Sequence, residues 1–441
     1  MIPLIAQIGA ERLDWFGFGI SSANRTAAFI ACAIIASWMF AAVFKKIGFW
    51  ISIVLSLMLF YFLIQTQSRG ALVALAIALA IFFAVGKIEY TKSRILVLVA
   101  ALVVVGCFYF QSSLSTRMSN MAALQSSSAN CRADIYLSGI KMLTDAPHGF
   151  PSENSPVEIY MRWYQNPDDS ETYISMINSH LEFMCRYGFL GSMAYILFWS
   201  FVLCITFPAK RDALSAAAFA TCICFGLCAA FSNIMNYWVL WIIPFVMIVV
   251  AILRNKERFR SKKFYHALTI LSLGTLLLIY SLSYALPRDC KLSFLTNGDV
   301  ICGNKKTPKY LLYMPLEKTV GARYGGELTQ FCKENNEAVL VSKKISDGEF
   351  DTALICEISN DNELSKIHAK RKILLNTRIF ESVSGCKDEN VVIYIGLLSD
   401  WRNRNAWIKV AENNTKIKVI MLDGIADYIP NWTNILKDEY R

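Results

Sequence analysis

A single histidine at the end of a long polar stretch is the residue best placed for chemistry in the first half of the chain. The stretch covers residues 113–187 within an otherwise apolar region, and His180 lies close to its end, just before the next apolar run. An imidazole titrates near pH ~6.5, which suits it to take a proton from a hydroxyl group. A lone histidine is more often structural than catalytic, but this position favours a function. We therefore select His180 as the candidate catalytic base.

Four arginines around this stretch are candidate anion-binding residues. Arg69 opens an apolar run, Arg132 opens a segment with helical spacing, and Arg162 stands among aromatic residues. Arg25 is a weaker candidate of the same kind as Arg69. A guanidinium group binds a diphosphate through paired hydrogen bonds. The alternatives are side chains that extend to lipid headgroups for the two arginines at apolar runs, and solvated loop residues for the other two.

The composition indicates that these residues belong to a membrane protein. Of the 441 residues, 55% are hydrophobic and only 18% are charged, and the mean hydropathy is +0.39. Soluble domains carry about 25% charged residues. Since a membrane span needs about 20 mostly apolar residues, we predict eight spans, at residues 25–44, 47–66, 70–86, 95–112, 188–207, 213–235, 237–253 and 265–286.

Basic residues predict the orientation of these spans. In the eight-span arrangement, the connections on one side are rich in Lys and Arg and poor in Asp and Glu, which is typical of cytoplasmic loops. The net charge of +10 is therefore explained without a nucleic acid partner. The opposite face then holds the polar stretch 113–187 and everything after Leu286. In a bacterium this face is the periplasm.

From about Pro287 the composition becomes that of a soluble domain. Apolar runs with β propensity alternate with helical patterns, which predicts an α/β domain with a mostly parallel sheet. The Asn297-Gly298 pair predicts a two-residue hairpin turn before it. The predicted strands are 310–314, 338–341, 353–358, 372–375, 391–395 and 417–422, and the predicted helices are 325–333, 362–370 and 403–412.

The chain lacks the common signatures of metal, nucleotide and ion-coupled sites. No CxxC pair with zinc spacing occurs among the 13 cysteines, so we predict no metal site and no cofactor. Cys290 and Cys302 are the closest cysteine pair in the soluble region, and an oxidising compartment would permit a disulfide. Walker loops, dinucleotide-binding glycine turns and GxSxG elbows are absent. The spans carry no acidic residues of the kind that ion-coupled transporters use.

Several short motifs follow one another over about residues 20–255. They are Asn24-Arg25-Thr26-Ala27, Ser68-Arg69-Gly70-Ala71, Arg132 at the start of a loop helix, Pro147-x-Gly149, and Ser179-His180 before Tyr187-Gly188-Phe189-Leu190-Gly191. Each motif is loose alone, but the ordered set resembles the O-antigen ligase/polymerase family. This superfamily includes lipopolysaccharide O-antigen ligases, O-antigen polymerases and bacterial protein O-oligosaccharyltransferases.

The resemblance implies metal-independent transfer of a glycan from a polyprenyl-diphosphate carrier to an acceptor hydroxyl. His180 would be the base, and Arg69, Arg132 and then Arg162 would bind the diphosphate. The acceptor could be lipid A-core, a glycan or a protein, because ligases, polymerases and protein glycosylases share the donor site. The implied location is the bacterial inner membrane, with the C-terminal domain in the periplasm.

The expected organisation is an N-terminal segment (1–24), a polytopic α-helical membrane domain (25–286) and a soluble α/β domain (287–441). The chain departs from the family in three respects. Members usually carry further spans before the first motif, they often have Asn where this chain has Leu181, and they do not usually end in such a domain. Two alternatives of another class remain. A glycolipid transporter would need a polar, ionisable path through the spans, and the sequence shows none. The missing N-terminal spans favour keeping the other, a non-catalytic membrane anchor for the α/β domain.

Overall fold

The computed structural model describes residues 22–86, 127–150, 155–165, 173–208, 213–288, 290–314, 324–356, 366–375, 391–396 and 417–422, and the single positions 409 and 412. The chain divides into two compact units. The first contains residues 1–137, 175–184 and 189–281, and the second contains residues 138–174, 185–188 and 282–441.

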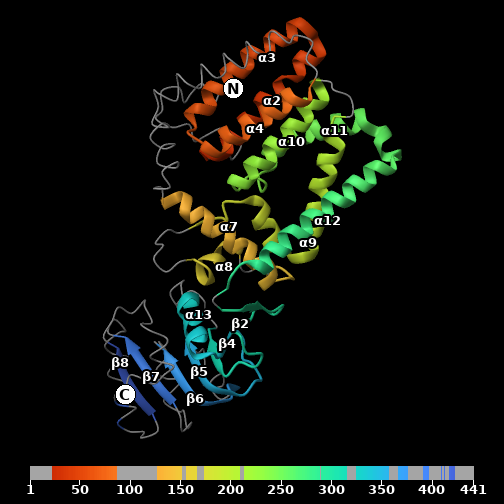
Figure 1. Cartoon of the computed structure of the whole chain (residues 1–441). Helices are drawn as coiled ribbons and strands as arrows, with labels where there is room; N and C mark the ends of the chain where they lie inside the picture. Colours follow the sequence, from red (N-terminus) through yellow and green to blue (C-terminus); the bar gives the residue numbers. More distant parts are fainter. Residues whose placement is uncertain are drawn as a thin grey trace. The chain divides into compact units, whose positions relative to one another are not determined.

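The first unit is a bundle of apolar helices (Figure 1). Among the described residues, five helical stretches are long and apolar enough to cross a membrane: Lys46–Gln65, Ser179–Thr206, Ala213–Phe231, Trp238–Arg260 and Lys262–Ala285. The helices are α2 (Ala23–Ser37), α3 (Met39–Gln65), α4 (Arg69–Val85), α9 (Ser179–Thr206), α10 (Ala213–Phe231), η1 (Trp238–Trp241), α11 (Ile242–Asn255), η2 (Lys256–Arg260) and α12 (Lys262–Ala285). α7 (Ser127–Asp145) begins in this unit and ends in the other.

The first predicted span is wrong at its C-terminal end. We predicted one segment at 25–44, but α2 ends at Ser37 and α3 begins at Met39 and continues through the second predicted span. The Trp38 N–H still donates to the Ile35 carbonyl, in a tightened last turn, and the Ser37 carbonyl accepts a hydrogen bond from the hydroxyl of Ser52. The predicted span 95–112 lies outside the described residues. The count of eight spans therefore stays a prediction.

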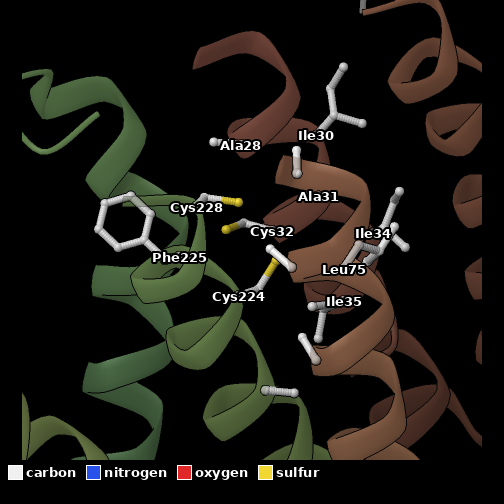
Figure 2. Close-up of a cluster of buried hydrophobic side chains, with 14 of the residues drawn as sticks. Ala28, Ile30, Ala31, Cys32, Ile34, Ile35, Leu75, Cys224, Phe225 and Cys228 are labelled. Atoms are coloured by element: carbon white, nitrogen blue, oxygen red, sulfur yellow. The ribbon is translucent and has the colours of Figure 1, made fainter. Parts of the chain in front are cut away.

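Small residues let α10 pack closely against α2 and α4. The buried residues of α10 are alanines and cysteines together with Ser215, Thr221 and Phe225. Figure 2 shows Cys32 of α2 facing Cys224 and Cys228 of α10. At the end of this contact, a Cβ atom on Gly70 would lie 2.8 Å from the Cβ atom of Phe231. Close backbone approach through small residues is a common way for helices to associate in membranes.

The second unit is built on a mixed sheet of eight described strands, in the order β1-β2-β4-β3-β5-β6-β7-β8. β1 and β2 are antiparallel to their neighbours, and the remaining pairs are parallel, as predicted. The strands are β1 (Leu292–Phe294), β2 (Val300–Gly303), β3 (Tyr310–Tyr313), β4 (Ala338–Ser342), β5 (Phe350–Cys356), β6 (Ala369–Leu375), β7 (Val391–Gly396) and β8 (Ile417–Leu422).

Two details of this domain differ from the expectation: the length of the hairpin turn and the end of one predicted helix. The predicted hairpin is present, but its turn has three residues: the Gly298 N–H donates to the Leu295 carbonyl, and Gly298 has a φ of 92°. This is the type I turn with a following left-handed glycine that three-residue hairpins favour. The predicted helix 362–370 is wrong at its end, because Ala369 already pairs with Phe350 in the sheet. Helix 325–333 is confirmed as α13 (Tyr324–Asn335), whereas most of 403–412 lies outside the described residues.

Part of the polar stretch folds within the second unit. α8 (Pro156–Trp163) begins with a capping box, in which Ser155 and Glu158 bond each other's backbone N–H. This reciprocal pairing satisfies backbone donors that a helix start otherwise leaves open. The rings of Phe150 and Trp163 contact Phe294 edge to face, with centroid separations of 5.0 and 6.4 Å. The polar stretch and the start of the sheet therefore share one core.

Candidate functional site

A polar cavity of about 140 Å³ lies in the first unit, where α2 and α4 begin and α10 ends. Two of the arginines selected from the sequence, Arg69 and Arg132, line it. The full lining is Asn24, Gln67, Ser68, Arg69, Gly70, Ala71, Arg132, Cys228, Phe231 and Ser232. The cavity therefore combines two guanidinium groups with amide and hydroxyl side chains.

The start of α4 places Arg69 at this cavity. The preceding Gln67 has a φ of 54°, in the left-handed region, and Ser68 is extended, so the chain turns sharply into the helix. The Ser68 hydroxyl donates to Oδ1 of Asn24 at 2.9 Å, which joins the starts of α2 and α4. The first helical hydrogen bond is donated by Leu72. A helix N-terminus presents backbone N–H groups and a partial positive charge, both of which favour an anion.

α7 brings Arg132 to the same place. Tyr136 lies one helical turn after Arg132, and its hydroxyl donates to the Ala230 carbonyl at the end of α10 at 2.8 Å. Burial raises the pKa of the Tyr136 hydroxyl, and the nearby Arg132 opposes this only in part. The hydroxyl therefore stays protonated and keeps its role as donor. This contact holds the turn of α7 that carries Arg132 beside the cavity.

Ser179 fastens the start of α9 to the turn after α10. Its hydroxyl donates to the Ser232 carbonyl at 2.9 Å and accepts from the Ile234 N–H at 2.8 Å. Asn178 caps the helix through its side chain, which accepts from two backbone N–H groups of the first turn. Ile177 just before it has a φ of 57°, a strained conformation for a β-branched residue. These contacts position Ser232, which lines the cavity.

His180 lies in the same unit but does not line the cavity. Its Nε2 is 2.8 Å from the Gly226 carbonyl, and its Nδ1 is 2.6 Å from the Tyr195 hydroxyl. A carbonyl oxygen only accepts, so Nε2 carries a hydrogen. The imidazole also contacts the Trp199 ring edge to face. Both ring nitrogens therefore have protein partners in this conformation.

The two remaining arginines occupy other places. The guanidinium of Arg25 stacks on the ring of Tyr237, 3.8 Å from its centroid, in a cation–π contact. Arg162 lies in the last turn of α8, in the second unit. The structure thus brings Arg69 and Arg132 together and does not gather the other three predicted site residues around their cavity. Sequence reasoning did not select Gln67 or Ser232, although each is within a few residues of a quoted motif or a span end.

The comparison with known proteins gives a family match for part of the chain. Residues 53–196, about one third of the chain, match the family model described as O-antigen ligase. This segment is similar to the O-antigen ligase family. It begins within α3 and ends within α9, and it includes Arg69, Arg132 and His180. No curated protein and no solved structure matches the chain. The match to the O-antigen ligase family confirms the resemblance inferred from the motifs.

Proposed function

We propose that this O-antigen ligase family protein transfers a glycan from a polyprenyl-diphosphate carrier to an acceptor hydroxyl during assembly of a surface polysaccharide. One observation carries the proposal: Arg69 and Arg132 line a single polar cavity at the N-terminus of α4. Two guanidinium groups and a helix N-terminus form a site suited to a diphosphate. The cavity's arginines both lie in the segment that matches the family.

The proposed reaction replaces one carbon–oxygen bond by another. The bond between the sugar's anomeric carbon and the diphosphate breaks, the acceptor oxygen bonds to that carbon, and the acceptor loses its proton. Negative charge builds on the departing polyprenyl diphosphate. Fixed guanidinium groups of Arg69 and Arg132 would stabilise this charge, and such stabilisation is commonly the largest single contribution to catalysis. Asn24 and Ser68 would help to orient the phosphate oxygens.

The role of His180 as the base stays a prediction. Its contacts with Tyr195 and Gly226 support a positioning role, in which the imidazole holds α9 against α10. As a base it would have to exchange one of these partners for the acceptor hydroxyl. Under this proposal the protein acts in the bacterial inner membrane, with the cavity open to the periplasmic face.

The proposal is tested by removing each arginine separately. Arg69→Ala and Arg132→Ala would be expressed in a bacterial host that depends on this protein for its surface glycan, and the glycan would be followed on gels alongside the protein level. Arg25→Ala is a matched control, because this arginine lies in the first turn of α2, in the same unit, but outside the cavity. We expect glycan to be lost in both cavity variants and retained in the control. Unchanged glycan at normal protein levels in both cavity variants would disprove the proposal.

The same gels distinguish the acceptors. Loss of long chains while single repeats remain on the core indicates a polymerase, and loss of all capping indicates a ligase. Intact lipopolysaccharide with loss of a glycosylated protein indicates a protein glycosylase. A non-catalytic anchor predicts none of these losses.

A further inference from the structure

Three buried cysteines meet in the second unit, although they are far apart in the sequence. Cys290 precedes β1, Cys302 lies in β2, and Cys332 lies in α13. Their sulfur atoms all lie within 4.8 Å of one another, and the Sγ atoms of Cys290 and Cys302 are 3.5 Å apart. Their exposed fractions are 8%, 0% and 1%. The β1–β2 hairpin and the packing of α13 therefore create a compact group of three thiols.

We propose that Cys290, Cys302 and Cys332 form a three-thiolate site for one soft cation of the copper(I) class. Metal–sulfur bonds of about 2.3 Å place the sulfurs of a trigonal site about 4 Å apart. The sulfurs already lie at that scale, so only small side-chain shifts are needed. Each thiol loses its proton as its sulfur binds the cation, and soft thiolate ligands select such ions.

The ligand number decides between copper(I) and zinc. Structural zinc sites are almost always four-coordinate, and no fourth His, Cys, Asp or Glu joins the three cysteines among the residues that the structure describes. Burial also leaves little access for a water ligand. Three sulfurs without a fourth ligand match the low coordination number of copper(I).

A disulfide between Cys290 and Cys302 is the competing use of the same atoms. It would require the sulfurs to approach from 3.5 Å to about 2.05 Å, and it would leave Cys332 as a single thiol. A cation uses all three sulfurs, whereas a disulfide uses two. The two outcomes are therefore distinguishable through Cys332.

The test measures copper retained by the purified full-length protein. Protein in detergent, with its thiols reduced, would receive copper(I) under nitrogen in competition with a chromophoric copper(I) chelator. The wild type would be compared with Cys332→Ser and Cys302→Ser. Cys204→Ser serves as the control for the loss of a cysteine elsewhere, since this cysteine lies in α9, outside the cluster.

We expect Cys332→Ser and Cys302→Ser each to retain one copper fewer per protein than the wild type and the control. X-ray absorption of the wild type at one copper per chain should show three sulfurs at about 2.3 Å, and this measurement remains informative if a serine variant fails to fold. Equal copper retention in all four proteins, or two-sulfur coordination in the wild type, overturns the proposal. A Cys290–Cys302 disulfide in protein isolated without reductant also overturns it.

Discussion

Gly149 and Gly188 lie backbone against backbone, and each occupies the space that a side chain on the other would need. A Cβ atom on Gly149 would lie 2.7 Å from the Gly188 nitrogen, and one on Gly188 would lie 2.3 Å from the Gly149 nitrogen. Both residues have positive φ values, 82° and 64°, and Gly188 interrupts the regular geometry of α9. The two glycine motifs noted in the sequence therefore belong to one steric contact.

Alanine at either glycine should destabilise the protein. The positive-φ backbone conformation alone costs a residue with a side chain roughly 1–3 kcal/mol, and the backbone overlap adds to this. We expect Gly188→Ala and Gly149→Ala to lower the thermal unfolding temperature in detergent. Gly274→Ala in α12 is the control, since a Cβ there meets nothing within 4 Å. Equal unfolding temperatures for all three variants would contradict the steric account.

Lysine in place of Arg69 should keep only part of the affinity of the cavity for a diphosphate. Arg69→Lys keeps the charge but loses the two-pronged geometry, whereas Arg69→Ala loses both. A charge-assisted hydrogen bond contributes about 1.5–3 kcal/mol, so we expect roughly tenfold to hundredfold weaker binding of a short-chain polyprenyl diphosphate by the alanine variant. Titration calorimetry on the purified protein measures this. Equal affinities for wild type and both variants would remove Arg69 from the donor site.

The hydrogen bonds of His180 predict that removing its side chain lowers the stability of the protein. His180→Ala removes the hydrogen bonds that the imidazole forms with Tyr195 and Gly226, and a typical hydrogen bond contributes about 0.5–1.5 kcal/mol. We expect a lower unfolding temperature, with partial recovery in His180→Gln, whose amide can both donate and accept. If His180→Ala instead unfolds like the wild type and fails only in transfer, with an altered pH profile, the base role is supported.

Asp145 predicts a pH dependence of stability in the second unit. Its carboxylate contacts the Nε atom of Arg288 at 3.1 Å and accepts from the Tyr164 hydroxyl at 2.8 Å. Burial nevertheless raises the pKa of Asp145 above its ordinary value of 3.8, and Tyr164 and Arg288 offset this only in part. The folded state thus binds the proton more tightly than the unfolded chain. The stability that this group contributes is complete below its ordinary pKa and is lost as pH rises through the folded-state pKa.

We therefore expect the wild type to lose stability relative to Asp145→Asn as the pH rises from about 3.8. Thermal unfolding of both proteins in detergent at successive pH values gives the difference directly, and each serves as the other's reference. A difference that stays constant, or that grows in favour of the wild type with rising pH, would contradict the raised pKa.

The sequence predicted most elements, because hydrophobic period and length are local properties. The apolar helices and the parallel strands from β3 to β8 were predicted from such patterns. The helix break at Trp38 was not predicted, because the residues on both sides of it are apolar. Arg69 and Arg132 were selected for charge and position, but nothing local could show that they share a cavity while Arg162 does not. The cysteine cluster that includes Cys332 was not predicted either. A sequence search detects metal-binding cysteines by their short spacing, and these cysteines are far apart in the sequence.

The hydrogen bonds of Ser179 show that part of the family motif has a structural role. Its hydroxyl bonds the backbone of the turn after α10, so this part of the signature preserves chain geometry whether or not any glycan is transferred. A homologue that had lost its enzymatic activity would keep such residues and still match the family. Under the proposed function, counterparts of Arg69 and Arg132 are therefore the better criterion for separating active enzymes from inactive paralogues in a genome survey.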